Sequence, residues 1–342
     1  MTTKKKITIK DIANVLGLST SAISKALNND SRISEKTKIA VRQVAENLNY
    51  QPNHLASALR SGKSRLVGVI IPRNNSNFFS SVLEKIEEVL NEKGYNIIIT
   101  QSNESFEKEC KCIESLLFTQ VDGIIASMAN ETTDLSYYEK IKAKGIPLVL
   151  FDRGEMELKV DYVGIDDYKT SFKIIDHLVA QGCKRIAHMG GFDGTRVYGN
   201  RIKGYKDALT KNEIAIDKTI ISNSKLRIED GRKIMEELLE LPNRPDAVYA
   251  AGDFAALGAL QVLNENKIKV PEEISLVGFS NERFTSYVVP AISTVDQNSA
   301  EIGKLAAEAF LNRIDNPIEE GGVNKIIIET ELLIRDSSNK NK

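Results

Sequence analysis

The chain contains 342 residues, of which 42% are hydrophobic and 27% charged, so its composition is that of a folded globular protein rather than a disordered or fibrous one. The formal net charge is only −1, but residues 1–65 hold 12 of the 46 basic and 4 of the 47 acidic side chains, which gives this segment +8 and the remainder −9. A basic module on an acidic body is typical of a polyanion contact confined to one end.

Several other classes of protein do not fit the sequence. No apolar run approaches ~18 residues and the N-terminus has no apolar segment, so we expect no membrane span, no signal peptide and a cytoplasmic location. Cys110 and Cys112 lack the spacing of a zinc or redox motif, and Cys183 and the three histidines are scattered. We therefore expect reduced thiols, no metal site and no cofactor.

Residues 8–27 predict two short helices joined by a tight turn. Thr8 can cap the first helix with Asp11 as its capping-box partner, and Gly17 supplies the left-handed residue that ends it. Ser19 can cap the second helix. The residues expected to face the core are Ile12, Val15 and Leu16 on the first helix, and Ala22, Ile23, Ala26 and Leu27 on the second.

The opposite face of the second helix carries short polar side chains and one cation, which suit a helix lying in the major groove of DNA. Any small helical hairpin would share the caps and the turn, so these features alone leave protein contact as an alternative. The spelling T-I-x-D-I-A-x-x-L-G-L-S-x-x-x-I-S-x-x-L-N, which starts at residue 8, resembles the signature of LacI/GalR-type transcriptional regulators. As a hypothesis, Thr20, Ser21 and Lys25 face bases, Ser19, Ser24 and Asn28 contact phosphates, and Thr8 and Tyr50 contribute further DNA contacts.

A third helix is predicted after Ser34, with Ile39, Ala40, Val44, Ala45 and Leu48 on its apolar side. It completes a helix-turn-helix headpiece over residues 1–52.

Residues 53–65 are predicted to form a short helix followed by a basic linker. Asn53 is a good N-cap, and Leu55, Ala56 and Leu59 fall on one face, but a helix this short is unstable alone, and a plain tether is the alternative. The resemblance implies a hinge helix that pairs with a second copy in the minor groove, where Leu59 wedges a base step and Asn53 and Ala56 also contact DNA.

From residue 66 onward, strands and helices alternate, which predicts an α/β fold with parallel sheets wrapped by helices. About 270 residues exceed one core, so we expect two lobes, and the resemblance implies a periplasmic-binding-protein-like effector-binding and dimerisation domain over 66–335. Lobe 1 is expected at about 66–165 plus 298–324, lobe 2 at about 166–297 plus 325–335, and a disordered tail at 336–342. Predicted strands are 66–71, 95–100, 123–126, 147–151, 162–165, 185–189, 247–250 and 275–279, and predicted helices are 79–93, 106–118, 135–144, 169–180, 197–210, 228–239 and 254–264.

No catalytic motif stands out in the sequence. The glycines after residue 189 do not match G-x-G-x-x-G, and neither a P-loop nor a nucleophile elbow is present, so we expect a binding protein and not an enzyme. Ligands of open parallel sheets bind beyond the carboxyl ends of strands. Those segments are 72–79, 127–130, 152–154, 190–196, 252–253 and 280–281.

Several residues in or near these segments are candidates for binding a small effector. Arg201 offers a rigid donor fork; by itself it would be typical of a surface arginine, but R-x-x-G-Y resembles the family's effector-binding motif. Asp253 could equally cap its helix, and two phenylalanines could stack on a ligand or belong to the core. The predicted set is Phe78, Phe79, Asp152, Arg201, Leu226, Asp253, Ser280 and Gln297.

Two positions depart from the family pattern. Ser280, in Gly278-Phe279-Ser280-Asn281-Glu282, stands where relatives commonly have a carboxylate that grips sugar hydroxyls, and Leu226 stands where some sugar-responsive members have an indole. The fold is unaffected, but the identity of the ligand stays open among sugars, sugar phosphates and sugar acids.

The sequence therefore predicts a ligand-responsive transcriptional regulator, a repressor of a carbohydrate-utilisation operon that binds a pseudo-palindromic DNA operator as a homodimer. The alternative is a sugar- or purine-binding protein that does not bind DNA.

Overall fold

The computed structural model describes residues 7–50, 63–192, 194–316 and 322–340. The chain divides into two compact units, Met1–Ser64 and Arg65–Lys342. The described part of the first unit, residues 7–50 and 63–64, contains three short helices, α1 (Ile9–Leu16), α2 (Thr20–Leu27) and α3 (Glu35–Asn47), around a core of Ile12, Ala13, Ile23, Ala26, Val41 and Ala45.

The caps that the sequence predicts in this unit are present. The amide and the hydroxyl of Thr8 both donate to Asp11 Oδ2 at 2.7 Å, and Gly17 has a φ of 64°, where a side chain would be strained. Ser19 Oγ accepts from the Ala22 amide at 3.2 Å. These bonds fix the short turn between α1 and α2, and so the direction in which α2 presents its polar face.

Three apolar residues of this unit lie outside the core, contrary to the sequence prediction. Val15 and Ile39 are 61% and 60% exposed, and Ala40 is also exposed. On α3 the inward stripe runs instead through Lys38, Val41 and Ala45. Lys38 takes a core position because its long aliphatic stem can be buried while its Nζ reaches Glu35 at 2.6 Å.

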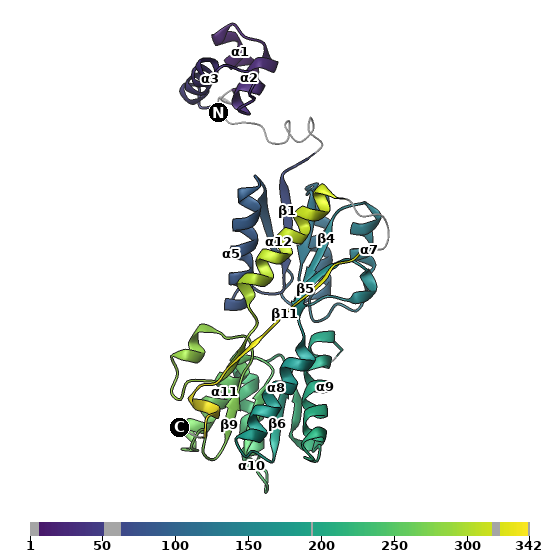
Figure 1. The fold of residues 1–342 in the computed structure, drawn as a ribbon, viewed down its shortest axis with the longest axis vertical. Coiled ribbons are helices and arrows are strands. Elements are labelled where there is room, and N and C mark those ends of the chain that lie inside the picture. Colours follow the sequence, from purple (N-terminus) through teal and green to yellow (C-terminus); the bar gives the residue numbers. More distant parts are fainter. Residues whose placement is uncertain (1–6, 51–62, 193, 317–321, 341–342) are drawn as a thin grey trace, which may run out of the picture. The chain divides into compact units, whose positions relative to one another are not determined.

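The second unit contains two parallel sheets, each covered by helices (Figure 1). The first has the order β11-β5-β4-β3-β1-β2, formed by β1 (Leu66–Ile71), β2 (Asn96–Gln101), β3 (Gly123–Ala126), β4 (Leu148–Phe151), β5 (Asp161–Ile165) and β11 (Lys325–Ile328). The second has the order β7-β6-β8-β9, formed by β7 (Ile221–Asn223), β6 (Ile186–Gly190), β8 (Ala247–Ala250) and β9 (Ser275–Val277). The two-lobe α/β fold is therefore confirmed.

The helices pack in pairs within each lobe. In lobe 1, α5 (Asn77–Glu92) packs on α12 (Ser299–Asp315), and α6 (Phe106–Phe118) lies near α7 (Ser136–Ala143). In lobe 2, α8 (Asp167–Ala180) packs on α9 (Arg196–Lys211), and α10 (Ile228–Glu240) packs on α11 (Asp253–Glu265). None of the helices in the described residues is long and apolar enough to cross a membrane.

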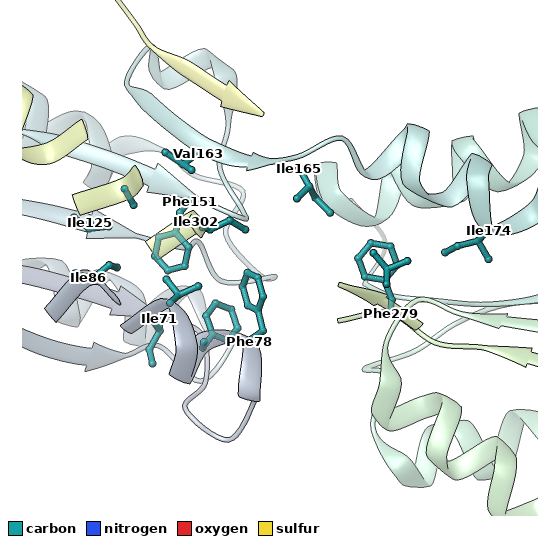
Figure 2. Packing of buried hydrophobic residues seen from close by; sticks show 14 of the residues in the cluster. Ile71, Phe78, Ile86, Ile125, Phe151, Val163, Ile165, Ile174, Phe279 and Ile302 are labelled. Carbon is teal, nitrogen blue, oxygen red and sulfur yellow. The ribbon is translucent and has the colours of Figure 1, made fainter. Parts of the chain in front are cut away.

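The chain passes between the lobes at 165–167, 296–299 and 328–331. Next to the last two crossings, β10 (Thr294–Asp296) and β12 (Glu331–Leu333) form an antiparallel pair. Buried side chains from both lobes line this region; Figure 2 shows Phe78 and Phe151 in lobe 1, and Phe279 and Ile174 in lobe 2.

Two expected boundaries are wrong. The segment 325–335 does not belong to lobe 2 as a whole, because Lys325–Ile328 pairs in parallel with β5 and so extends the sheet of lobe 1. The tail is ordered at least to residue 340: Ser337 Oγ donates to the Leu276 carbonyl at 2.5 Å, Ser338 Oγ lies 2.7 Å from Ser293 Oγ, and both serines are fully buried.

Ending the chain at Arg335 should lower the free energy of unfolding by about 2 kcal/mol or more, because it removes the buried Ser337 hydroxyl that donates to the Leu276 carbonyl and accepts from the Ser293 amide. Urea unfolding followed by circular dichroism measures the change. A chain that lacks only residues 341–342 is the control. Equal stability of all three proteins would show that the tail contributes nothing.

Candidate functional site

The predicted DNA-contacting residues of the headpiece lie on and around α2. Thr8, Ser19, Thr20, Ser21 and Asn28 are exposed, whereas Ser24, Lys25 and Tyr50 are half-buried. Ile23 and Ala26 hold the other side of α2 in the core. The helix therefore presents one face of short polar groups, and its N-terminus carries the partial positive charge that attracts phosphate. The predicted contacts Asn53, Ala56 and Leu59 lie outside the described residues.

The second unit contains a cavity between its lobes, hereafter the inner cavity, with about 570 Å³ of empty space, part of it open to solvent. All eight predicted effector residues line it: Phe78, Phe79, Asp152, Arg201, Leu226, Asp253, Ser280 and Gln297. They come from both lobes and from segments more than 200 residues apart in the sequence. The carboxyl ends of β1, β4, β8 and β9 bring them together, as expected for parallel sheets.

Arg201 is held rigidly at this cavity. It is 4% exposed, its Nε donates to Asp167 Oδ1 at 2.8 Å, and its Nη1 donates to the Ala251 carbonyl at 2.9 Å. Its guanidinium carbon lies 3.5 Å from the centre of the Phe279 ring. Burial opposes the charge, but Asp167 keeps the pKa of Arg201 above its ordinary value. The fork is therefore charged and fixed in orientation before any ligand arrives.

Three residues at the cavity have left-handed backbone conformations, which non-glycine residues rarely adopt. The φ angles are 56° for Asp152, 55° for Leu226 and 107° for Ser280. Such strain costs free energy and is concentrated at functional sites. Burial raises the pKa of Asp152, against the effect of Arg153, whose Nε lies 3.8 Å from its carboxylate.

Asp253 does not cap α11, because Gly252 is the N-cap. Its carboxylate instead accepts from Thr294 Oγ1 at 2.7 Å and from the Glu282 amide at 2.8 Å, which ties the loop after β9 to the strand that leads into lobe 1. Burial raises the pKa of Asp253 to about 7, against the effect of these two bonds. Asp253 thus shapes the cavity as well as lining it.

Phe78 and Phe79 occupy positions that fit both predicted alternatives, a place in the core and a place at the ligand site. Phe78 and Phe79 are 4% and 3% exposed and form part of the core, and they also line the inner cavity. Their rings meet edge to face with centroids 5.1 Å apart, which fixes the wall that they present.

Sequence reasoning missed several residues of the cavity. Glu282 extends from lobe 2 to the first turn of α5, where both carboxylate oxygens accept from the Asn77 amide at 2.9 and 3.1 Å. Arg73, Ser76 and Arg153 fall within the post-strand segments 72–79 and 152–154, so that signal locates them. Tyr198 and Glu282 lie one or two residues beyond the segments 190–196 and 280–281, because the lining continues past the loop into the next element.

Comparison with known proteins gives matches to both units. Residues 8–53 match the model "Bacterial regulatory proteins, lacI family", and residues 175–338 match "Periplasmic binding protein-like domain". The transcriptional repressor CytR of Escherichia coli (strain K12) is 30% identical over 331 residues, which cover 97% of this chain and 96% of the relative.

Two solved structures resemble this one. The complex of the transcriptional regulator CelR with cellobiose has a TM-score of 0.73 and 25% identity, and covers 97% of this chain and 100% of that chain. The lac repressor dimer bound to operator and the anti-inducer ONPF has a TM-score of 0.86 over 98% of this chain and 99% of that chain; at 22% identity it shows the shared fold alone.

The raised pKa of Asp253 predicts a pH-dependent stability. The folded state keeps the proton up to about pH 7, whereas an unfolded aspartate loses it near pH 4, so this contribution is full below pH 4 and is lost as the pH rises through 7. For this one group we expect about 2 kcal/mol more stability at pH 5.5 than at pH 8.

Asp253→Asn should remove that slope while keeping both bonds, because an amide can accept from the Glu282 amide and donate to Thr294 Oγ1. Urea unfolding of both proteins at the two pH values measures it. Parallel pH profiles for parent and variant would show that Asp253 titrates at an ordinary pKa.

Proposed function

We propose that this chain, which belongs to the LacI family of bacterial regulatory proteins, is a homodimeric repressor. A carbohydrate bound in the inner cavity controls its affinity for a pseudo-palindromic operator. Family membership makes it a DNA-binding transcriptional regulator and removes the alternative of a binding protein that does not contact DNA. The effector, the dimer and the roles of single residues are the proposed part.

The observation that carries the proposed effector site is the convergence of all eight predicted residues on one cavity. Its walls combine aromatic rings from lobe 1 with a fixed guanidinium, a carboxylate whose residue has a strained backbone, and the polar side chains of Ser280 and Gln297. Ligand sites commonly pair an apolar lining with a few fixed polar groups. A sugar ring, with apolar C–H faces and hydroxyls around its edge, suits that combination, and the similar CelR was solved with cellobiose.

The proposed DNA site is the exposed face of α2, with Thr20, Ser21 and Lys25 toward bases, and Ser19, Ser24 and Asn28 toward phosphates. A single helix of eight residues reads few base pairs, so specificity requires two copies about one DNA turn apart. We propose that residues 53–60 pair between protomers in the minor groove, with Leu59 as the wedge.

Control of DNA binding requires a difference in effector affinity between two arrangements of the lobes. Contacts that cross the cavity support such a link. The carboxylate of Glu282 reaches the N-terminus of α5, and Phe78 and Phe79 of the same helix line the cavity. A ligand that changes the spacing of the lobes would therefore move α5 relative to lobe 2.

Lys25→Ala should weaken binding to the preferred operator about 10-fold, because it removes one base contact. The operator is first selected from random DNA by the full-length protein, and affinities are then measured by fluorescence anisotropy at several salt concentrations. Lys304→Ala, an exposed lysine of α12, is the charge-matched control. An unchanged affinity for Lys25→Ala would contradict the placement of α2 in the groove.

Arg201→Lys should abolish the effector response and leave operator affinity unchanged. The lysine still supplies a positive charge to the buried Asp167 but loses the planar fork over Phe279. The measurement is release of the selected operator by a saccharide that stabilises the parent protein, with thermal unfolding as the folding control. A full response from the folded variant would contradict the role of Arg201.

A further inference from the structure

A second, larger cavity, hereafter the outer cavity, adjoins the inner one. It has about 1390 Å³ of empty space, part of it open to solvent, against about 570 Å³ for the inner cavity. The two cavities share Arg73, Leu226 and Phe254 in their linings, so they are neighbours.

One wall of the outer cavity is rich in amide side chains. They come from the loops after β1, β2 and β3 of lobe 1 and from the end of β2, and they are Asn74, Asn75, Gln101, Asn103 and Asn130. The Oδ1 atom of Asn130 is buried and has no hydrogen-bond donor among the described residues. Amides both donate and accept, which matches hydroxyl groups, and the buried oxygen of Asn130 specifically needs a donor.

The facing wall comes from lobe 2 and combines apolar side chains with the charged residues Lys225, Arg227 and Glu229. Phe192, Leu226, Ile228 and Phe254 contribute to it, and the Phe254 ring packs against Phe284 with centroids 5.2 Å apart. A slot with an amide wall and an aromatic wall fits a ring that has hydroxyls along one edge and C–H groups on its face. That description applies to a pyranose or furanose unit.

Charged side chains line both cavities in equal numbers of each sign. The inner cavity is lined by three arginines and three acidic residues, and the outer cavity by three basic and three acidic residues. Three of the cations are already paired: Arg201 with Asp167 at 2.8 Å, Arg153 with Glu104 at 2.6 Å, and Arg73 with Glu104 at 3.3 Å. The N-terminus of α5, which would attract an anion, holds the carboxylate of Glu282. Lys225 and Arg227, on either side of Leu226, line the outer cavity and form no ion pair with a described residue. The charges therefore do not select between a neutral and an acidic saccharide.

We infer that the outer cavity is a second saccharide subsite, and that the effector is an oligosaccharide of at least two units, one in each cavity. The inference rests on the proposed function, because the inner cavity must first hold a sugar. The second unit binds through the amide wall of lobe 1 and the phenylalanines of lobe 2, so it also bridges the two lobes.

Isothermal titration calorimetry on the full-length protein tests this with probes of increasing length: glucose, galactose and xylose, against cellobiose, maltose, lactose and xylobiose. At least one disaccharide should bind about 10-fold or more tightly than its monosaccharides, since one or two added hydrogen bonds have that effect.

Asn130→Ala should weaken the disaccharide about 3- to 10-fold and change monosaccharide binding less than about 2-fold. It removes no hydrogen bond of the folded protein, because only the Asn130 backbone amide is bonded, to Glu104. Asn96→Ala, an exposed position at the start of β2, is the matched control and should leave both affinities unchanged.

The outcomes separate the two levels of the proposal. Monosaccharides that bind as tightly as every disaccharide, or an Asn130→Ala variant with unaltered disaccharide affinity, would overturn the second subsite and leave the inner site standing. Binding of no saccharide at all would overturn the proposed carbohydrate effector itself.

Discussion

The buried ion pair between Arg201 and Asp167 is the interaction on which the proposed effector site depends. Both side chains are about 5% exposed, so each charge would be very unfavourable without the other. The pair joins the first turn of α8 to α9, and the Ala251 carbonyl and the Phe279 ring then fix the guanidinium from β8 and β9. Several elements of lobe 2 thus contact one arginine, and these contacts fix the shape of the inner cavity on the lobe 2 side.

Lobe 2 is linked to lobe 1 through a second set of buried polar contacts. The carboxylate of Asp253 accepts hydrogen bonds from the Glu282 amide and from Thr294 Oγ1. The carboxylate of Glu282 accepts one from the amide of Asn77 in the first turn of α5. The same turn carries the two phenylalanines of the ligand cavity. A ligand between the lobes therefore acts on a few discrete contacts rather than on a diffuse interface, which is the kind of arrangement that can switch between two states.

Much of this follows from the sequence, but not all. Alternating strands and helices predict two parallel sheets, and the rule that ligands bind beyond strand ends locates five of the eight predicted cavity residues. Arg201 and Leu226 rest on the family resemblance, and Gln297 also lies outside the segments that the rule gives. The pairing of β11 with β5 could not be predicted, because the sequence of a four-residue strand does not determine which strand it pairs with. Ile39 and Ala40 were wrongly assigned to the core, because the phase of a short helix is uncertain by one residue. The core position of Lys38 was not predicted, because a lysine can bury its aliphatic stem. The bridge from Glu282 to α5 joins positions 205 residues apart, which no local pattern predicts.

The central claim is that the ligand cavity and the DNA-binding face are coupled. The most direct measurement is a linkage cycle on the full-length protein: operator affinity with and without saturating saccharide, and saccharide affinity with and without saturating operator. The account predicts that both affinities change by the same factor, on the order of 5- to 150-fold, since thermodynamic linkage is reciprocal. Saccharide affinity that is identical on free and operator-bound protein would contradict it.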